Sequence, residues 1–293
     1  MKLADKANKK AKDESDIQSL KSEVSVGCQG WNYTDWVTKA GSEPVFYPHG
    51  TKSNEMLETY ARVFETVEVD STFYAIPSET TLENWYKRTP DEFTFSLKLP
   101  RAITHEHLLQ ASSFDVLDEF CERILALKEK LASVLVQLPP QFDTGGANVR
   151  SLLEFLPRLP AKIKFAVEFR SRDWFKGDTL DVLAKHKTAL CLSEGNWVPR
   201  EMIFEAAGTQ TADFAYVRFM GERDLARFDV VQRKMDAHLQ IWHEHLAEIA
   251  VPKFVYFSNF YEGFAPASAN KLKKLFGQET IEPDELESQP SLF

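Results

Sequence analysis

The feature that most constrains the fold of this chain is a regular alternation of short apolar runs with amphipathic segments. From Val24 onward, runs rich in β-branched and aromatic residues alternate with stretches whose apolar residues recur at helical spacing. Strands that alternate with helices in this way pair in parallel, because each connection must cross back over the sheet. The eight runs of the strand type cover residues 24–28, 66–69, 93–98, 133–137, 164–169, 188–192, 214–219 and 253–257.

Helical patterns fill most of the intervals between these runs. No convincing helix is expected in residues 193–213. Eight strand–helix units over about 255 residues match the size and order of a single TIM (β/α)8 barrel, an α/β fold. The alternative is an open, doubly wound sheet, but its usual glycine-rich nucleotide-binding motif follows none of the early strands. The helical patterns cover residues 54–63, 79–88, 112–130, 148–156, 178–185, 230–249 and 265–276.

The chain of 293 residues has room for one such barrel and two polar tails. Residues 1–20 are polar and charged, which predicts a flexible leader, and the barrel domain is expected over residues 21–277. Residues 278–293 are acidic, contain proline and lack hydrophobic periodicity, so we expect a disordered tail.

Composition narrows the classes of function. The net charge is −9, from 35 Lys and Arg against 44 Asp and Glu, which argues against a surface coated with positive charge for nonspecific binding to nucleic acid or membrane. The net charge does not argue against a local basic pocket. Cys28, Cys121 and Cys191 are too scattered for a disulfide framework, and no apolar stretch approaches eighteen residues. We therefore expect a cytoplasmic protein.

Polar side chains stand at the ends of nearly all the predicted strands, where a TIM barrel builds its active site. Period-two alternation puts Glu68 with Asp70, and Glu168 with Arg170, on common strand faces. The alternative is that these charges only pair with one another to close the barrel, as buried ions must. For the whole set of polar residues at the strand ends, we favour the interpretation as a ligand site. If these faces point inward, seven residues lie together at one end of the barrel: Glu68, Lys98, Gln137, Glu168, Arg170, Arg218 and Asn259.

These strand ends and the loops after them supply the candidate site residues. The candidate catalytic residues are Glu68, Lys98 and Glu168, because carboxylates beside an amine can move protons. Flat aromatic side chains beside Arg and Lys suit a ligand with a ring and an anionic group, although long loops also need aromatic cores of their own. The candidate ligand-binding residues are Trp31, Asp70, Tyr74, His105, Gln137, Arg170, Trp174, Arg218 and Asn259.

Metal chemistry has little support in the sequence. The close pair His105 and His107 flanks a single glutamate, and no other histidine spacing fits a zinc site, so no built-in metal is expected. The alternative of one Mg²⁺ held by Glu68 and Glu168 is compatible with the sequence, because Mg²⁺ needs few protein ligands.

Several ordered motifs resemble those of a known family. They are GCQGWNY at 27–33, FYP at 46–48, VEVDSTFYAIP at 67–77, Lys98 with TH at 104–105, QLPP at 137–140, and EFR at 168–170 with Trp174. Together they identify the chain, from about residue 24 to 276, as a member of the YecE-like family, the domain of unknown function seventy-two. The resemblance implies a TIM barrel. The family's activity is not established; a similarity to apurinic-site barrel endonucleases implies DNA binding at the barrel mouth.

The chain departs from the family pattern at three positions. Asp70 stands where Asn is common, Met220 stands where a His is expected before Gly221, and Phe260 stands where another His is frequent. The two missing histidines weaken the analogy with metal-dependent nucleases, whose sites need many His and carboxylate ligands.

The last five residues, QPSLF at 289–293, resemble the short peptide by which bacterial replication and repair proteins dock on the sliding clamp. In that mode, Leu292 and Phe293 fill an apolar pocket while Gln289 supplies a hydrogen bond. The alternative is that the Leu-Phe pair packs on the barrel or has no role. The tail is the one sequence feature that independently points towards DNA.

Three interpretations of function follow, and whether the chain is an enzyme stays open. The first is an anion- or phosphate-binding barrel that acts on or binds nucleic acid, with a link to repair. The second is an isomerase or lyase for a sugar or phosphorylated sugar, and the third is a ligand-binding barrel without catalysis. A long basic track beside the mouth would favour nucleic acid, whereas a deep closed pocket would favour a small ligand.

Overall fold

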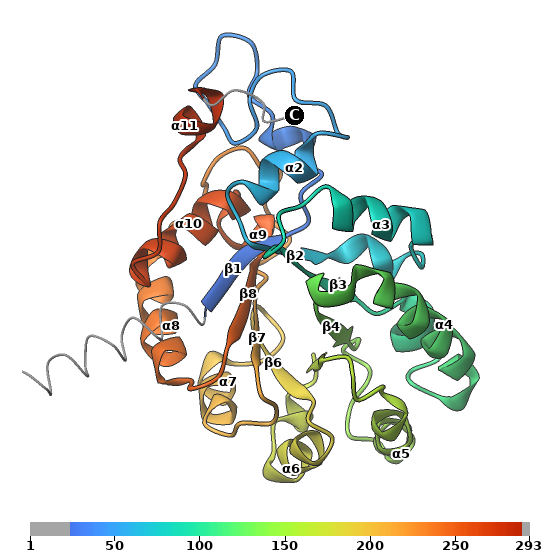
Figure 1. Ribbon diagram of the computed structural model, residues 1–293. Coiled ribbons are helices and arrows are strands. Elements are labelled where there is room, and N and C mark those ends of the chain that lie inside the picture. Colours follow the sequence, from blue (N-terminus) through green and yellow to red (C-terminus); the bar gives the residue numbers. More distant parts are fainter. Residues whose placement is uncertain (1–23, 289–293) are drawn as a thin grey trace, which may run out of the picture.

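The computed structural model describes residues 24–288, which form a closed barrel of eight parallel strands (Figure 1). Each strand pairs with the next one along the chain, and the first closes the barrel against the eighth. The TIM barrel prediction is therefore confirmed. The strands are β1 (Val24–Gln29), β2 (Thr66–Val69), β3 (Thr94–Lys98), β4 (Leu131–Gln137), β5 (Phe165–Glu168), β6 (Ala189–Glu194), β7 (Ala215–Phe219) and β8 (Lys253–Phe257).

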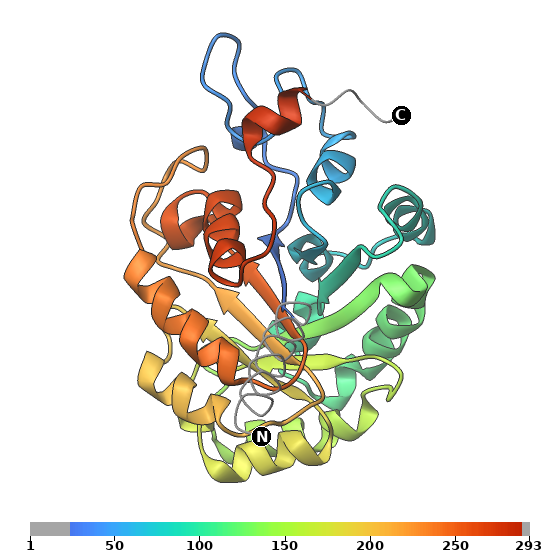
Figure 2. The same cartoon turned by 60° about the vertical axis from the view of Figure 1, so that its left-hand side comes forward.

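Helices surround the barrel, as Figures 1 and 2 show. One of them, α7, lies in the interval where the sequence predicts no helix. It has only eight residues, and Ile203 and Ala206 are its buried positions, so its amphipathic pattern is too short to stand out. The helices are α2 (Met56–Ala61), α3 (Glu79–Lys87), α4 (Phe114–Ile124), α5 (Gly146–Phe155), α6 (Gly177–Lys185), α7 (Arg200–Ala207), α8 (Asp236–Glu248), α9 (Asn259–Glu262), α10 (Ala265–Leu275) and α11 (Pro283–Ser288).

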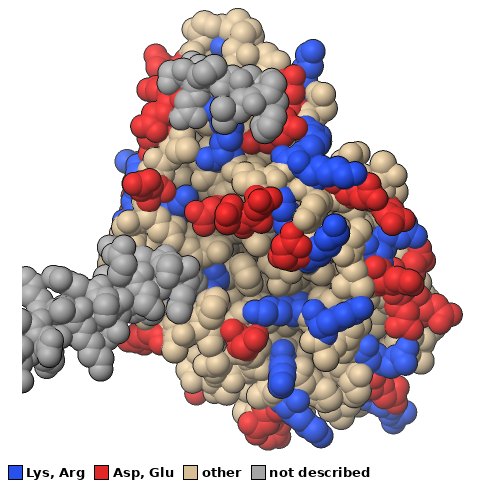
Figure 3. Space-filling model, viewed as in Figure 1, with Lys and Arg blue, Asp and Glu red and all other residues tan. Residues whose placement is uncertain are grey.

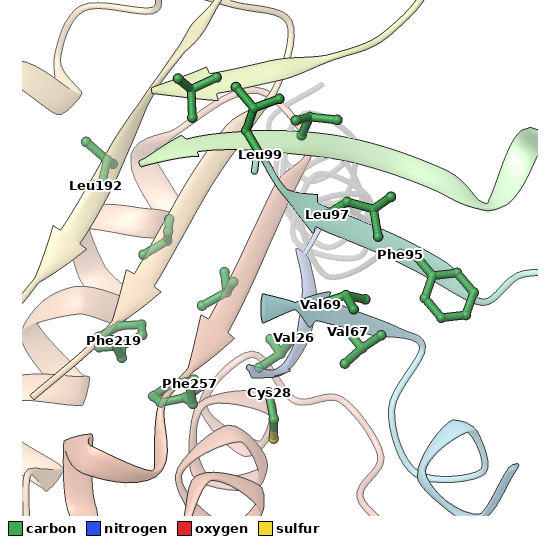
Figure 4. Close-up of a cluster of buried hydrophobic side chains, with 14 of the residues drawn as sticks. Val26, Cys28, Val67, Val69, Phe95, Leu97, Leu99, Leu192, Phe219 and Phe257 are labelled. Carbon is green, nitrogen blue, oxygen red and sulfur yellow. The ribbon is translucent and has the colours of Figure 1, made fainter. Parts of the chain in front are cut away.

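Alternation along the strands divides the core into two layers. Residues such as Val67 and Leu97 belong to the large apolar cluster that joins the strands to the surrounding helices (Figure 4). A smaller cluster fills the barrel and includes Tyr216 and Tyr256. The Tyr256 hydroxyl lies 2.8 Å from the Ser96 hydroxyl, so the inner layer satisfies its polar atoms by hydrogen bonds. The charged residues described below lie above this layer.

The acidic tail is partly ordered, which corrects the prediction of disorder over residues 278–293. Helix α11 lies near the segment that follows β1, in both Figure 1 and Figure 2. Leu286 is buried in the apolar core, and this one anchor is too short a signal for sequence periodicity to reveal. Residues 1–20 and the peptide with Gln289, Leu292 and Phe293 lie outside the described residues. The flexible leader and the clamp peptide therefore stay predictions.

Within residues 24–288, none of the helices combines the length and the apolar character that a membrane span needs.

Candidate functional site

A buried ion network closes the upper end of the barrel interior. Arg218, on β7, reaches Glu68 on β2 through Nε at 3.1 Å and Nη2 at 2.7 Å, both to Oε1. Its Nη1 donates to Glu168 Oε2 on β5. The three side chains are at most 1% exposed. One guanidinium therefore bridges two carboxylates that stand on separate strands.

Further hydrogen bonds hold this network in one geometry. The Tyr216 hydroxyl donates to Glu68 Oε2 at 2.6 Å, and Arg170 Nε donates to Glu168 Oε1 at 3.0 Å. When the Gln29 amide is assigned with its oxygen facing Arg218, that oxygen accepts from both Nε and Nη2 at 3.2 Å. Each carboxylate thus has partners on both oxygens, which is the condition under which buried charges are tolerated.

The two glutamates have carboxyl pKa values shifted in opposite directions. Burial raises the pKa of Glu68 to about 6, although Arg218 opposes the shift. Burial also acts to raise the pKa of Glu168, but the charges of Arg218 and Arg170 outweigh it and lower that pKa to about 2. Burial opposes the positive charge of Arg218 as well, yet Glu68 and Glu168 hold its pKa well above the usual value. Glu168 and Arg218 therefore form a permanent ion pair.

The opposite pKa shifts predict different effects for two matched variants. Because the pKa of Glu168 is lowered in the folded state, its ionised carboxylate stabilises the fold above pH 4.5, and this stabilisation is lost as the pH falls towards 2. Glu168→Gln should therefore lower the free energy of unfolding by about 3 kcal/mol at pH 7. The raised pKa of Glu68 has the opposite effect. As the pH rises from 4.5 to 6, Glu68 loses its proton in the folded state, and the free energy of unfolding falls by about 2 kcal/mol. Glu68→Gln should therefore cost clearly less at pH 7. Urea denaturation at pH 4.5 and 7 measures both; equal losses at pH 7 would contradict the assignment.

A cavity of about 410 Å³ opens above the network. Glu68 and Glu168 lie beneath it and do not line it, and their catalytic role stays a prediction. Their carboxylates accept hydrogen bonds from Arg218, and that of Glu168 also accepts one from Arg170. The cavity is lined by Gln29, Tyr33, Asp70, Lys98, Arg170, Gly195, Asn196, Trp197, Arg218, Met220, Gly221, Arg223, Ser258 and Phe260.

Asp70 and Lys98 face each other in this cavity. Asp70 begins a short 3-10 helix directly after β2, and its Oδ1 lies 3.9 Å from Lys98 Nζ and 3.7 Å from Arg218 Nη2. That oxygen is shielded from solvent and has no hydrogen-bond donor among the described residues. Burial lowers the pKa of Lys98, with Asp70 opposing the shift. The Lys98 ammonium also lies 4.1 Å from the centre of the Phe73 ring.

Three further predicted residues lie around the cavity without lining it. The His105 ring packs edge-on against Phe73 at 4.9 Å, and burial with the charges of Lys98 and Arg170 lowers its pKa to about 4. His105 is therefore neutral at pH 7. Gln137 is buried, and its Nε2 donates to the carbonyl of the next residue at 2.8 Å. Tyr74 is 79% exposed.

Three other predicted ligand-binding residues do not line the cavity. The Trp31 ring meets Trp85 edge-on at 5.5 Å, and Trp174 stacks on Phe169 at 4.8 Å. Asn259 Oδ1 accepts from the backbone of Ala265 at 3.0 Å and from the ring nitrogen of Trp36 at 3.2 Å. The loops after the strands need aromatic cores of their own, and these residues build them.

The sequence analysis missed several cavity residues as binding candidates. Trp197 is 50% exposed, and the guanidinium carbon of Arg170 lies 5.4 Å from the centre of its ring. Arg223 lines the cavity from the loop after β7. The departures from the family pattern were a usable signal: Asp70, Met220 and Phe260 all line this one cavity.

The residues proposed for Mg²⁺ do not fit a metal. The Arg218 guanidinium occupies the space between Glu68 and Glu168, and both carboxylates accept hydrogen bonds from it. A cation placed there would first have to displace a charged side chain. Among the described residues, no group of three His, Cys, Asp or Glu side chains is arranged to hold an ion.

The chain matches, over residues 25–291, the family model described as "Protein of unknown function DUF72". It belongs to the DUF72 family. UPF0759 protein YunF of Bacillus subtilis (strain 168) is 33% identical over 158 residues, and UPF0759 protein YecE of Escherichia coli (strain K12) is 31% identical over 156. These matches cover 52% and 53% of this chain, and the chain spans about half the length of both relatives, 52% of each.

Solved DUF72 structures share the fold. The DUF72 family protein of Thermotoga maritima MSB8 superposes with a TM-score of 0.71 at 25% identity, over 87% of this chain and 99% of that chain. A DUF72 family protein of Enterococcus faecalis V583 gives 0.68 at 21% identity, over 88% and 97%. The activity of the DUF72 family is unknown, so the function of this chain must be argued from its own site.

Proposed function

We propose that the cavity binds a small anionic compound and transfers a proton on it, as an isomerase or lyase does. The observation that carries the proposal is the place of Asp70. Its carboxylate stands at the cavity wall, between the side chains of Lys98 and Arg218, with one oxygen that no described donor reaches. A carboxylate beside two cations is the arrangement that general acid–base chemistry on an anionic intermediate requires.

The charge of the lining supports an anionic ligand. Among the described lining residues, four cationic side chains face one carboxylate, Asp70. The two glutamates beneath the cavity are bound to Arg218, and Glu168 also binds Arg170, which leaves Lys98 and Arg223 less compensated. Lys98 and Arg170 are only 11% and 13% exposed, so a ligand between them would be largely shielded from water. Charge-assisted hydrogen bonds are strong in such a place.

The chemistry assigns a role to each group that touches the ligand. Asp70 takes a proton from the carbon next to a carbonyl group; the electron pair of the broken C–H bond forms a carbon–carbon double bond, and the π pair of the carbonyl group moves to its oxygen. Lys98 and Arg218 stabilise the oxyanion that forms, because both cations are fixed before the reaction begins. Where the deprotonated carbon carries a hydroxyl group, return of the proton to the former carbonyl carbon, with transfer of the hydroxyl proton to the other oxygen, completes an isomerisation. Where the next carbon carries a leaving group, the oxyanion re-forms the carbonyl group, a double bond forms towards that carbon, and the leaving group departs with its electron pair, which completes a lyase reaction.

The shape of the site favours a small ligand over nucleic acid. A cavity of about 410 Å³ is within the ordinary range for small-molecule pockets. On the face shown in Figure 3, Lys and Arg side chains are interspersed with Asp and Glu, and they form no continuous basic track there. Binding of nucleic acid by this chain stays a prediction.

Binding of phosphate and phosphonate tests the proposal by calorimetric titration. Arg170→Met should weaken binding by about 1.5–3 kcal/mol, roughly 10- to 150-fold, because it removes a charged hydrogen-bond donor from the cavity. Arg158→Met, at a half-exposed position outside the lining, is the matched control and should bind normally. If the intact protein binds neither anion, the proposal is wrong. If a short oligonucleotide binds with a steep salt dependence and the small anions do not, the nucleic-acid interpretation replaces it.

A further inference from the structure

The cavity has two chemically different sides. Asp70, Lys98, Arg170 and Arg218 line it from the ends of β2, β3, β5 and β7. The other part of the lining carries apolar or aromatic side chains from the loops after β1, β6 and β7 and from α9. These are Tyr33, Trp197, Met220 and Phe260, and we call them the apolar wall.

Gly221 allows the apolar wall to form. Its φ of 65° lies in the left-handed region that favours glycine. A Cβ at this position would lie 2.1 Å from the carbonyl oxygen of Phe260, far inside contact distance. The loop after β7 therefore lies directly on the backbone of α9, and the residues on the two sides of this contact, Met220 and Phe260, reach the same cavity.

The aromatic members of the wall offer ring surface rather than hydrogen bonds. The Tyr33 hydroxyl already donates to the carbonyl of Gln29 at 2.8 Å, so its ring is what remains for a ligand. Trp197 is half exposed and lines the cavity, so its ring is accessible to a ligand. The Arg170 guanidinium against its ring links the apolar wall to the charged side.

We propose that the ligand is an amphipathic anion: an acidic group held by Lys98 and Arg170, joined to an aromatic ring that packs against Trp197, Met220 and Phe260. This inference rests on the proposed function and narrows its substrate class. A cavity of about 150 Å³ suffices for benzene, so about 410 Å³ has room for a ring and a charged group together.

A fully hydroxylated ligand suits the apolar wall poorly. Hydroxyl groups turned towards Met220 and Phe260 would lose hydrogen bonds to water and find no equivalent partner, and each unpaired group weakens binding. A flat apolar ring has no such loss and gains dispersion contacts with the aromatic faces. The apolar wall therefore favours aryl acids over sugar phosphates.

Two probes with the same head group test this inference. Phenylphosphonate and methylphosphonate differ only in the ring, and calorimetric titration should show phenylphosphonate binding roughly 10- to 100-fold more tightly, the worth of burying one aromatic side chain. Met220→Gln and Trp197→Ala should each reduce this preference several-fold, because each removes part of the apolar wall. Ile241→Gln, at a 39% exposed position on α8, is the matched control and should keep the full preference.

The outcomes separate the two proposals. If both phosphonates bind equally, the aryl inference is wrong while the anion site stands. If the preference survives both wall variants, the ring binds elsewhere and the inference is also wrong. If neither phosphonate binds, the anion site fails and the inference fails with it.

Discussion

Replacing Arg218 with Met should lower the free energy of unfolding by about 3–5 kcal/mol, because it leaves two buried carboxylates without their cation. The side chain is 1% exposed and bridges Glu68 and Glu168 inside the barrel. Methionine fills a similar volume, so the loss reports the charge rather than a cavity. Urea denaturation at pH 7, followed by circular dichroism, measures the change.

The charge explanation can be separated from general damage to the core. Arg170→Met removes a cation that is 13% exposed and, among the described residues, forms an ion pair with Glu168 alone, so it should lower the free energy of unfolding much less. Adding Glu68→Gln and Glu168→Gln to the Arg218→Met chain should restore part of the lost stability, because the two fully buried carboxylates are then replaced by neutral amides. If Arg218→Met does not fold alone, this triple variant still gives a measurement. A triple variant no more stable than Arg218→Met would show that the network contributes little through its charges.

The barrel could be predicted from the sequence because its signal is repeated. All eight predicted strands overlap the observed ones, since each parallel strand of a TIM barrel is a short apolar run flanked by helical periodicity. Single short elements have no such repetition. Helix α7 buries Ile203 and Ala206, and α11 is held by Leu286, so neither has a pattern that stands out from a loop.

The candidate site was predictable only in part. Alternation along the strands correctly grouped Glu68, Glu168 and Arg218, because period two decides which face a side chain is on. Alternation does not predict how deep in the barrel a side chain lies. Glu68 and Asp70 are two residues apart and share a face, yet Glu68 lies beneath the cavity and Asp70 lines its wall. Residues in loops have no period at all. That is why Trp31 and Trp174 were predicted in the site and Trp197 was missed.

The fixed position of Arg218 connects the fold to the proposed chemistry. Its Nη2 contacts both buried Glu68 and, at 3.7 Å, Asp70 at the cavity wall, so one guanidinium belongs to the core and to the site. A cation held in this way does not need to reorganise when negative charge develops on a ligand, which is the principal source of electrostatic catalysis. Stability and function thus depend on the same side chain, and variants of Arg218 cannot separate them. Variants of Asp70 can, because among the described residues no donor forms a hydrogen bond with its buried Oδ1.

Replacing Asp70 with Asn should slow proton transfer by about 10²- to 10⁴-fold, the usual contribution of a positioned general base, while the protein stays folded. The amide has nearly the same shape as the carboxylate. Proton transfer is measured as exchange of deuterium from D₂O into the carbon next to the carbonyl group of aryl-substituted keto acids, followed by NMR. Unchanged phosphonate binding would show that the cavity is intact.

Two further variants decide whether Asp70 acts as the base. Asp173→Asn, an exposed aspartate on the loop after β5 that does not line the cavity, is the matched control and should exchange at the wild-type rate. Asp70→Glu keeps the carboxylate but moves it by one methylene, so it should retain more activity than Asp70→Asn. Equal exchange by the wild type and Asp70→Asn would exclude Asp70 as the base. If the wild type catalyses no exchange but binds phosphonates, the cavity is a binding site without this chemistry.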